Sequence, residues 1–192
     1  MNSQIKTSVT EPVDLYAYDY NNDGKLDLIL CYYIQGKSYP MNSRDELLKQ
    51  INQLRNKFPD YNSYADATIK DIIDQKLLDK TFKLSAYIME SCWIENVDGE
   101  LILKKLPDLV QVSYVNAFIN YDFDGDGAQE VISAGNFYPL KPQIGMNDAS
   151  MGSLLKFSKD SLIVAKDIIS PLWLYGDIRD MALLSFKNGK KM

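Results

Sequence analysis

This chain of 192 residues contains no histidine and only two cysteines, Cys31 and Cys92. Without histidine it cannot form a Ser-His-Asp or Cys-His nucleophilic site, or a histidine-ligated zinc site. Two cysteines allow one disulfide at most. A free cysteine usually behaves as a small core hydrophobe, so we expect two free thiols, with a single disulfide as the alternative. These absences leave carboxylates as the main source of chemistry.

Long apolar runs and an excess of basic residues are also missing. The apolar runs fall far short of the roughly 20 residues that span a bilayer, and residues 1–6 lack the apolar region of a signal peptide. Lys and Arg number 21 against 26 Asp and Glu, which gives a net charge of −5. This balance argues against nucleic-acid binding. A hydrophobic content of 46% is enough for a globular core.

Two segments share one template, in which oxygen-bearing side chains alternate and an acid closes the series. Calcium takes six to eight oxygen ligands, and alternate side chains of a tight turn converge on one such point. A glycine at the sixth position permits the turn. Asn, Asp and Gly also form ordinary hairpin turns, but two copies of the template favour two calcium sites. The predicted ligands are Asp19, Asn21, Asp23, the Lys25 carbonyl and Asp27 in the first loop, and Asp122, Asp124, Asp126, the Ala128 carbonyl and Glu130 in the second.

The residues around the loops indicate which calcium motif they belong to. An EF-hand needs flanking helices and a bidentate glutamate at the twelfth loop position, where this chain has Leu30 and Ser133. The flanking segments are rich in the aromatic and β-branched residues that favour strands. Each loop is therefore predicted to join two strands.

A recurring unit of strand, loop and strand indicates a repeat protein. A third, degenerate copy lies at residues 175–184 and has lost the ligand pattern. The closing acids Glu130 and Asp180 are 50 residues apart, which is close to the period of about 40 to 50 for a four-stranded propeller blade. Asp27 and Glu130 are 103 residues apart. The excess predicts an insertion between the first two copies.

The predicted insertion covers about residues 41–84 and has helical character. Ser43 and Glu46 fit a capping box, and an amphipathic helix follows that ends near Pro59. A second amphipathic helix is predicted over residues 64–78. Their apolar stripes could form a partner groove or a ligand cap, but packing on the insertion's own core is favoured. The two stripes comprise Leu47, Leu48, Ile51, Leu54 and Phe58, and Ala65, Ile69, Ile72, Ile73 and Leu77.

The loop pattern Asp-x-Asn/Asp-x-Asp-Gly-x-x-Asp/Glu between strands resembles the FG-GAP or VCBS repeats of integrin-alpha-type β-propellers. Residues 39–43, 64–68, 134–138 and 144–152 are similar to the C-terminal propeller region of large VCBS-repeat, cartilage-acidic-protein-like proteins of Bacteroidetes. Where those proteins often read Gly-Arg-Tyr, this chain has Gly145, Met146 and Asn147, so no role of that arginine and tyrosine carries over. The resemblance implies calcium-stiffened propellers of surface or secreted proteins, and it supplies no reaction.

We therefore predict a mainly β fold with a helical insertion, an open partial β-propeller of about two to three blades in a single domain of residues 1–192. Residues 14–40 plus 85–112 would form the first blade, 113–165 the second, and 166–192 the start of a third. Closed propellers have roughly four to eight blades. We therefore interpret the chain as a piece of a larger exported protein, extracellular, at the cell surface or periplasmic, with neighbouring blades or domains as partners. Open sheet edges could also pair two copies into a homodimer.

The predicted function is a non-catalytic binding or interaction module with structural calcium, whose ligand is a glycan or a protein. The alternative is a carbohydrate-active or other hydrolytic enzyme that uses paired carboxylates outside the loops. A pocket with two metal-free carboxylates would favour the enzyme, and an exposed cluster of three or more aromatic residues would favour glycan binding. Candidate acids are Glu90, Glu95 and Asp148, and candidate stacking residues are Tyr32, Tyr33, Tyr39, Trp93, Tyr138 and Trp173.

Overall fold

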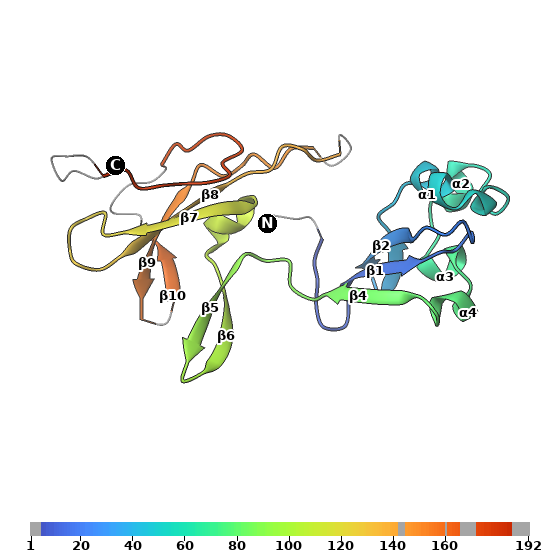
Figure 1. The fold of residues 1–192 in the computed structure, drawn as a ribbon, viewed down its shortest axis with the longest axis horizontal. Coiled ribbons are helices and arrows are strands. Elements are labelled where there is room, and N and C mark those ends of the chain that lie inside the picture. Colours follow the sequence, from blue (N-terminus) through green and yellow to red (C-terminus); the bar gives the residue numbers. More distant parts are fainter. Residues whose placement is uncertain (1–4, 142–144, 160, 166–171, 186–192) are drawn as a thin grey trace. The chain divides into compact units, whose positions relative to one another are not determined.

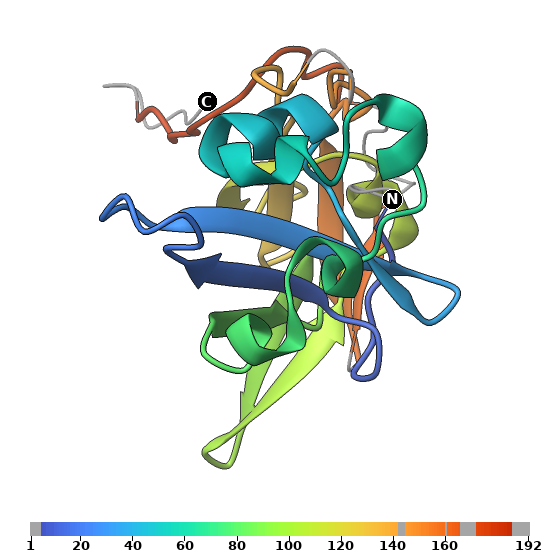
Figure 2. The same ribbon diagram turned by 90° about the vertical axis from the view of Figure 1, so that its right-hand side faces the viewer.

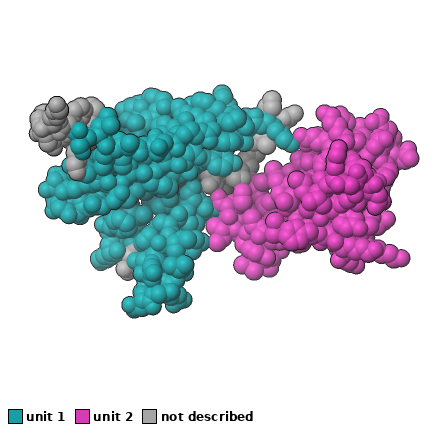
Figure 3. Space-filling model, in the orientation of Figure 1, with its two compact units in different colours: residues 1–4, 90–192 teal, residues 5–89 magenta. Residues whose placement is uncertain are grey.

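The computed structural model describes residues 5–141, 145–159, 161–165 and 172–185. This part of the chain is mainly β, with ten strands in three antiparallel sheets, none of which closes into a barrel. The chain divides into two compact units (Figure 3), where we predicted a single domain. Unit 2 comprises residues 5–89, and unit 1 comprises residues 90–192 with 1–4. Each unit has its own four-stranded sheet and its own buried cluster, which accounts for the division.

Unit 2 contains the first loop between two antiparallel strands, as predicted (Figure 1). Tyr18 and Asp27, at the ends of these strands, pair across the loop. The strand after the helices returns to the sheet and pairs with β1 on its other side. The sheet order is β3-β2-β1-β4, formed by β1 Val13–Tyr18, β2 Asp27–Ile34, β3 Lys37–Pro40 and β4 Phe82–Ala86.

The helices come between β3 and β4 in the chain. In space they lie beside the strands of unit 2 (Figure 2). They are shorter than the two helices predicted from the apolar spacing. The first ends at Gln50, with Ile51 as its C-cap. Within the second, Thr68 and Asp74 occupy N-cap positions and begin new turns, as residues of these types favour caps over helix interiors. Asp60 caps a further turn by accepting from the N–H of Ser63. We call residues 44–78 the helical segment: α1 Arg44–Gln50, the 3₁₀ helix η1 Asn52–Arg55, α2 Tyr61–Tyr64, α3 Ile69–Ile72 and α4 Gln75–Leu78.

Most residues of the two apolar stripes are buried, as expected, although Ala65 is exposed and Leu77 is only partly buried. The buried ones do not pack among themselves alone. Ile29 and Cys31 on β2 are fully buried in the same cluster as the stripe residues. The sheet therefore supplies part of the core that covers the helices. The buried members of the cluster are Tyr16, Tyr20, Ile29, Cys31, Leu47, Leu48, Ile51, Leu54, Phe58, Ala67, Ile69, Ile72 and Ile73.

Unit 1 contains the second loop in a second four-stranded sheet of order β10-β9-β8-β7. Tyr121 pairs with Glu130 across this loop, the same register as in unit 2. The strands are β7 Val115–Tyr121, β8 Glu130–Gly135, β9 Ser153–Ser158 and β10 Ser161–Val164, and the 3₁₀ helix η2 Asp108–Val112 precedes them.

Residues 85–112 do not complete the first sheet as the predicted first blade required. Half of them form a separate two-stranded hairpin, β5 Cys92–Val97 with β6 Glu100–Lys105. Asp98 and Gly99 at its turn have φ angles of 53° and 92°, which is typical of the tight turns that join hairpin strands. The local turn therefore pairs these strands with each other.

The degenerate third copy is described only in part. Residues 172–185 contain none of the ten strands, and the rest of the predicted third blade lies outside the described residues. The backbone N–H of Ile178 donates to the carbonyl of Gly135 at 3.4 Å. The amide of Asn136 donates to the carbonyl of Gly176 at 3.0 Å. These bonds attach the segment to the end of β8.

Candidate metal-binding loops

The first loop, residues 19–27, folds around its own acceptor side chains. Asp19 accepts hydrogen bonds from the backbone N–H groups of Asp23, at 3.0 Å, and of the glycine that follows, at 2.9 Å. Asn21 and Asp23 each accept from the N–H group two residues further on, both at 2.9 Å. The closing acid, Asp27, accepts from the N–H of Tyr20 at 3.0 Å. The side chains thereby draw the backbone into a compact turn.

The second loop, residues 122–130, makes the same set of bonds except that its first acid accepts from the fourth residue of the loop where Asp19 accepts from the fifth. Asp122 accepts from the N–H groups of both loop glycines, at 2.7 and 3.1 Å. Asp124 and Asp126 accept from the residues two positions on, at 3.1 and 2.8 Å. Oε2 of Glu130 accepts from the N–H of Phe123 at 2.9 Å. The two loops thus share a hydrogen-bond pattern as well as a sequence template.

The backbone of both loops is left-handed at the same two positions. Gly24 and Gly127, at the sixth position, have φ angles of 84° and 90°. Asn22 and Gly125, at the fourth, have φ angles of 58° and 78°. The sequence template did not include the fourth position. Asn and Gly tolerate left-handed angles better than other residues. Their presence at the fourth position of both loops could therefore have predicted the second left-handed residue.

The second loop gathers carboxylates around one point. Asp122, Asp124 and Glu130 each offer a carboxylate oxygen, and these oxygens all lie within 4.8 Å of one another. Glu130 is 1% exposed, and its Oε1 is buried without a hydrogen-bond partner. An unpaired buried acceptor is costly, and a cation would satisfy it. The residues therefore fit a metal ion. In the part of the chain described, the acids of the first loop form no such grouping.

The other predicted ligands lie at the outer side of the loops. Lys25, Asp126 and Ala128 are exposed, and the N–H groups of Lys25 and Ala128 donate within their loops. The amide nitrogen of Asn21 donates to Oδ2 of Asp23 at 3.2 Å. The structure therefore places each predicted ligand in its loop, and the acids converge most closely in the second.

In the first loop, the ionised form of the Asp27 carboxyl is disfavoured by its surroundings. Burial raises the pKa of this carboxyl, and the nearby charges of Asp23 and Asp19 raise it further. Its side chain is almost fully covered, with the residue 4% exposed. A cation between these acids would favour the ionised form and oppose both effects.

Two neighbours of the loops were missed by the sequence interpretation. Gln50, the last residue of α1, contacts the first loop, where its carbonyl accepts from the Asn21 amide at 2.7 Å. Lys156 on β9 lies beside the second loop, with its Nζ 3.4 Å from Oδ2 of Asp124. Neither belongs to a local motif, and each lies more than 20 residues from its loop partner. Only the fold brings them there.

Aromatic side chains line two hollows, one in each unit. A hollow of 380 Å³ in unit 1 is lined by Trp93, Phe118 and Phe157 among other apolar residues. A hollow of 280 Å³ in unit 2 is lined by Tyr32, Tyr39 and Tyr64. Asp66 is the sole carboxylate among the lining residues of the two hollows.

One candidate acid outside the loops and both thiols have identified surroundings. Glu95 forms an ion pair with Lys104, and both cysteines are free thiols, as expected. No helix in the described ranges is long and apolar enough to cross a membrane.

Comparison with protein families, curated proteins and solved structures gave no significant match to this chain. The family resemblance therefore rests on the loop template and on the motifs that accompany it. What the structure adds is the common geometry of the two loops.

Proposed function

We propose that this chain is a calcium-binding repeat of the FG-GAP or VCBS kind, with two calcium sites, that acts as a non-catalytic binding or interaction module. The observation that carries the proposal is the agreement of the two loops. They match in template, in strand register and in the hydrogen bonds that their acids accept. A hairpin turn alone does not require a buried closing acid at the same place in both copies.

The buried closing acids support a cation rather than a plain turn. Asp27 is 4% exposed and Glu130 is 1% exposed. One carboxylate oxygen of each accepts a hydrogen bond from the N–H of the loop's second residue. The unpartnered Oε1 of Glu130 leaves an acceptor available. Oxygen-rich sets of this kind suit hard cations such as calcium. When bound, calcium would supply the positive charge that neutralises these acids.

The role of the loops would be structural, because each joins two neighbouring antiparallel strands, β1 to β2 and β7 to β8. Mutual repulsion of their acids opposes the compact turn. Hydrogen bonds from backbone N–H groups already hold the acids in position, so a cation would stabilise an arrangement that is built in advance. A ligand that binds only the folded state adds about 2.7 kcal/mol of stability at a hundredfold excess over its Kd.

A binding module is favoured over a hydrolase by the lining of the two hollows. A hydrolase of the two-carboxylate kind needs paired acids in one site, and the two hollows offer one between them. Each hollow does contain three aromatic side chains, the residue type expected for a glycan or protein ligand. We propose an extracellular, cell-surface or periplasmic location, as part of a larger exported protein with an open partial propeller.

Calcium titration of the full chain tests the proposal. Calorimetry should give two sites per chain, and a chelator should lower the melting temperature. The variant Glu130→Gln should lose one site, whereas Asp108→Asn, which alters a side chain that is 96% exposed, should keep both. A chain that binds no calcium, or melts at the same temperature with chelator, would contradict the proposal.

A further inference from the structure

The two sheets differ beside their loops, at the position where a third strand should pair. In unit 1, Val131 follows the closing acid and pairs with Leu155 on β9. Leu28 holds the same position in unit 2, but β3 pairs only with the stretch from Cys31 to Ile34. The backbone of Leu28 must therefore find other partners.

The side-chain amide of Gln50 supplies those partners. Its Oε1 accepts from the N–H of Leu28 at 2.9 Å, and its Nε2 donates to the carbonyl of Leu28 at 3.5 Å. A peptide group of a neighbouring strand makes the same pair of bonds. Two residues along β2, the N–H of Leu30 donates to Oδ1 of Asn42 at 3.3 Å, and its carbonyl accepts from the N–H of Met41 at 2.7 Å. The start of the insertion and α1 thus replace the third strand.

Gln50 also contacts a predicted ligand directly. Its carbonyl accepts from Nδ2 of Asn21 at 2.7 Å. Because the amide nitrogen of Asn21 is engaged there, its Oδ1 is directed back into the loop, where it accepts from the N–H of Asp23. Gln50 therefore holds the loop at its third position, through Asn21, and just beyond its closing acid, through Leu28.

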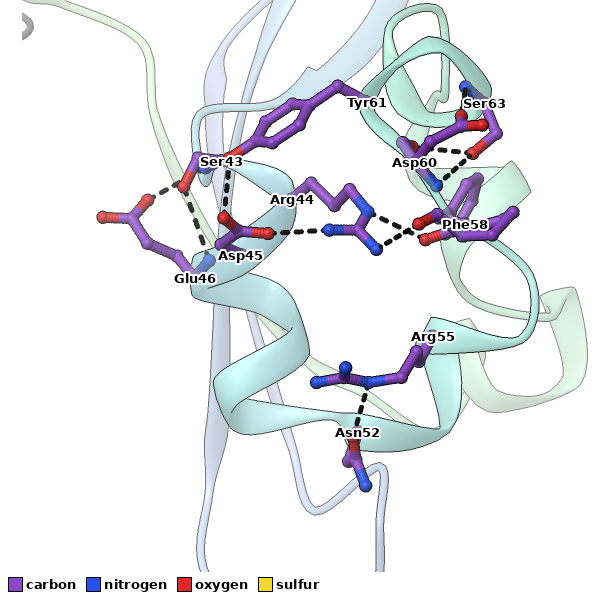
Figure 4. A network of polar contacts seen from close by, with 11 residues as sticks. Ser43, Arg44, Asp45, Glu46, Asn52, Arg55, Phe58, Asp60, Tyr61 and Ser63 are labelled. Carbon is purple, nitrogen blue, oxygen red and sulfur yellow. Dashed lines mark hydrogen bonds and ion pairs between the residues drawn. The ribbon is translucent and has the colours of Figure 1, made fainter.

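Gln50 is presented by a braced helix rather than a free side chain on a loop. Arg44 at the start of α1 donates to the carbonyls of Phe58, at 2.8 Å, and Pro59, at 2.7 Å (Figure 4). Leu47 and Ile51 of the same stretch are buried against the sheet. Gln50 therefore cannot move away from the loop unless α1 as a whole shifts from its place against the sheet.

We infer that Gln50 is a positioning residue for the cation site of the first loop, and that the site and the docked helical segment stabilise each other. The inference rests on the proposed function. Binding coupling is reciprocal: if the docked segment strengthens calcium binding at the first loop, calcium at that loop must strengthen docking. The second loop lacks this coupling, because a true strand, β9, lies beside it.

Calcium affinity measured at the first loop alone, in the full chain, tests this coupling. Asp122→Asn with Asp124→Asn disables the second loop, so that calcium reports on the first alone. In that background Gln50→Ala should weaken calcium binding about tenfold, the lower end for losing a residue that orients a metal ligand. Gln50→Glu keeps the acceptor for Leu28 and should recover part of the loss. Gln53→Ala, at an exposed position, serves as the control and should change nothing.

Hydrogen exchange provides the second readout. Calcium should slow amide exchange in residues 44–58 of the otherwise unchanged chain, and Asp19→Asn with Asp23→Asn should abolish that slowing. Equal calcium affinity in the Gln50→Ala and parent chains, or exchange in residues 44–58 that ignores calcium, would overturn the inference while leaving the calcium sites intact. Absence of calcium binding in the parent chain would instead defeat the proposed function.

Discussion

The ammonium group of Lys156 lies 3.4 Å from Oδ2 of Asp124, so a positive charge of the protein itself faces the third position of the second loop. The first loop has a neutral residue, Asn21, at that position, and its neighbour is the amide of Gln50. The two loops share their internal geometry but differ in the charge beside them. The lysine side chain is 37% exposed, so it can move into solvent.

Replacing Lys156 by Gln should tighten calcium binding at the second loop. The ammonium group competes with a cation for Asp124 and repels it, and its removal should raise affinity by about three- to tenfold at low salt. The gain should shrink as salt screens the charge. Lys159→Gln makes the same change of charge at an exposed position and should alter affinity less. Calorimetric titration at two salt concentrations measures both variants, and equal effects would show that only net charge matters.

Two glycine substitutions should differ sharply in cost. A Cβ at Gly135 would lie 2.0 Å from the backbone oxygen of Tyr114, which cannot move without breaking the start of the sheet. Gly135→Ala should therefore cost about 3 kcal/mol or more. Gly127→Ala meets open space and suffers only from its φ angle of 90°, for about 1 to 2 kcal/mol. Urea unfolding measures both, and a smaller loss at Gly135 would contradict the expectation.

Alkaline pH should remove a contribution of Cys31 to stability. Burial raises the pKa of this thiol from its ordinary 9.0 to about 12. The unfolded chain then releases the proton first, so stability is complete below pH 9 and falls by up to about 1.4 kcal/mol per pH unit toward pH 12. The stability gap between the parent chain and Cys31→Ala should therefore narrow as pH rises above 9. A constant gap in urea titrations from pH 8 to 10.5 would exclude the effect.

The ion pair between the buried Asp14 and the partly exposed Lys83 of unit 2 should be sensitive to loss of its lysine. Asp14 is fully buried, and its Oδ2 lies 2.9 Å from Nζ of Lys83. Lys83→Met leaves that carboxylate without a cationic partner, although Ser85 still donates to its Oδ1 at 2.6 Å, and should cost about 3 kcal/mol. Adding Asp14→Asn should recover part of the loss, since the buried charge is then gone. Lys80→Met, at an exposed position, should be nearly neutral. A double variant no more stable than Lys83→Met would show that the charge was not the cause.

Local patterns predicted the elements that local chemistry controls. The strands beside each loop follow from aromatic and β-branched residues, and the capping box of Ser43 with Glu46 is present as predicted. The helices were predicted too long, because the apolar spacing of the first continued past Gln50, where α1 ends, and that of the second continued past Thr68 and Asp74. Thr68 and Asp74 are N-cap residues of new turns, a position that such residue types favour over a helix interior, and this preference outweighed the periodicity.

The two loops could be recognised without the fold, because their predicted ligands lie within nine residues and alternate along one tight turn. The helical character of the insertion could likewise be read from the sequence. Only the tertiary structure decided what stands beside each loop, Gln50 at the first and Lys156 at the second, since both arrive from distant segments through the packing of a helix and a strand. Residues 92–105 pair as a hairpin through the local turn at Asp98 and Gly99. Only the fold leaves that hairpin outside both four-stranded sheets, because the strand that completes the first sheet, β4, comes from just after the helical segment.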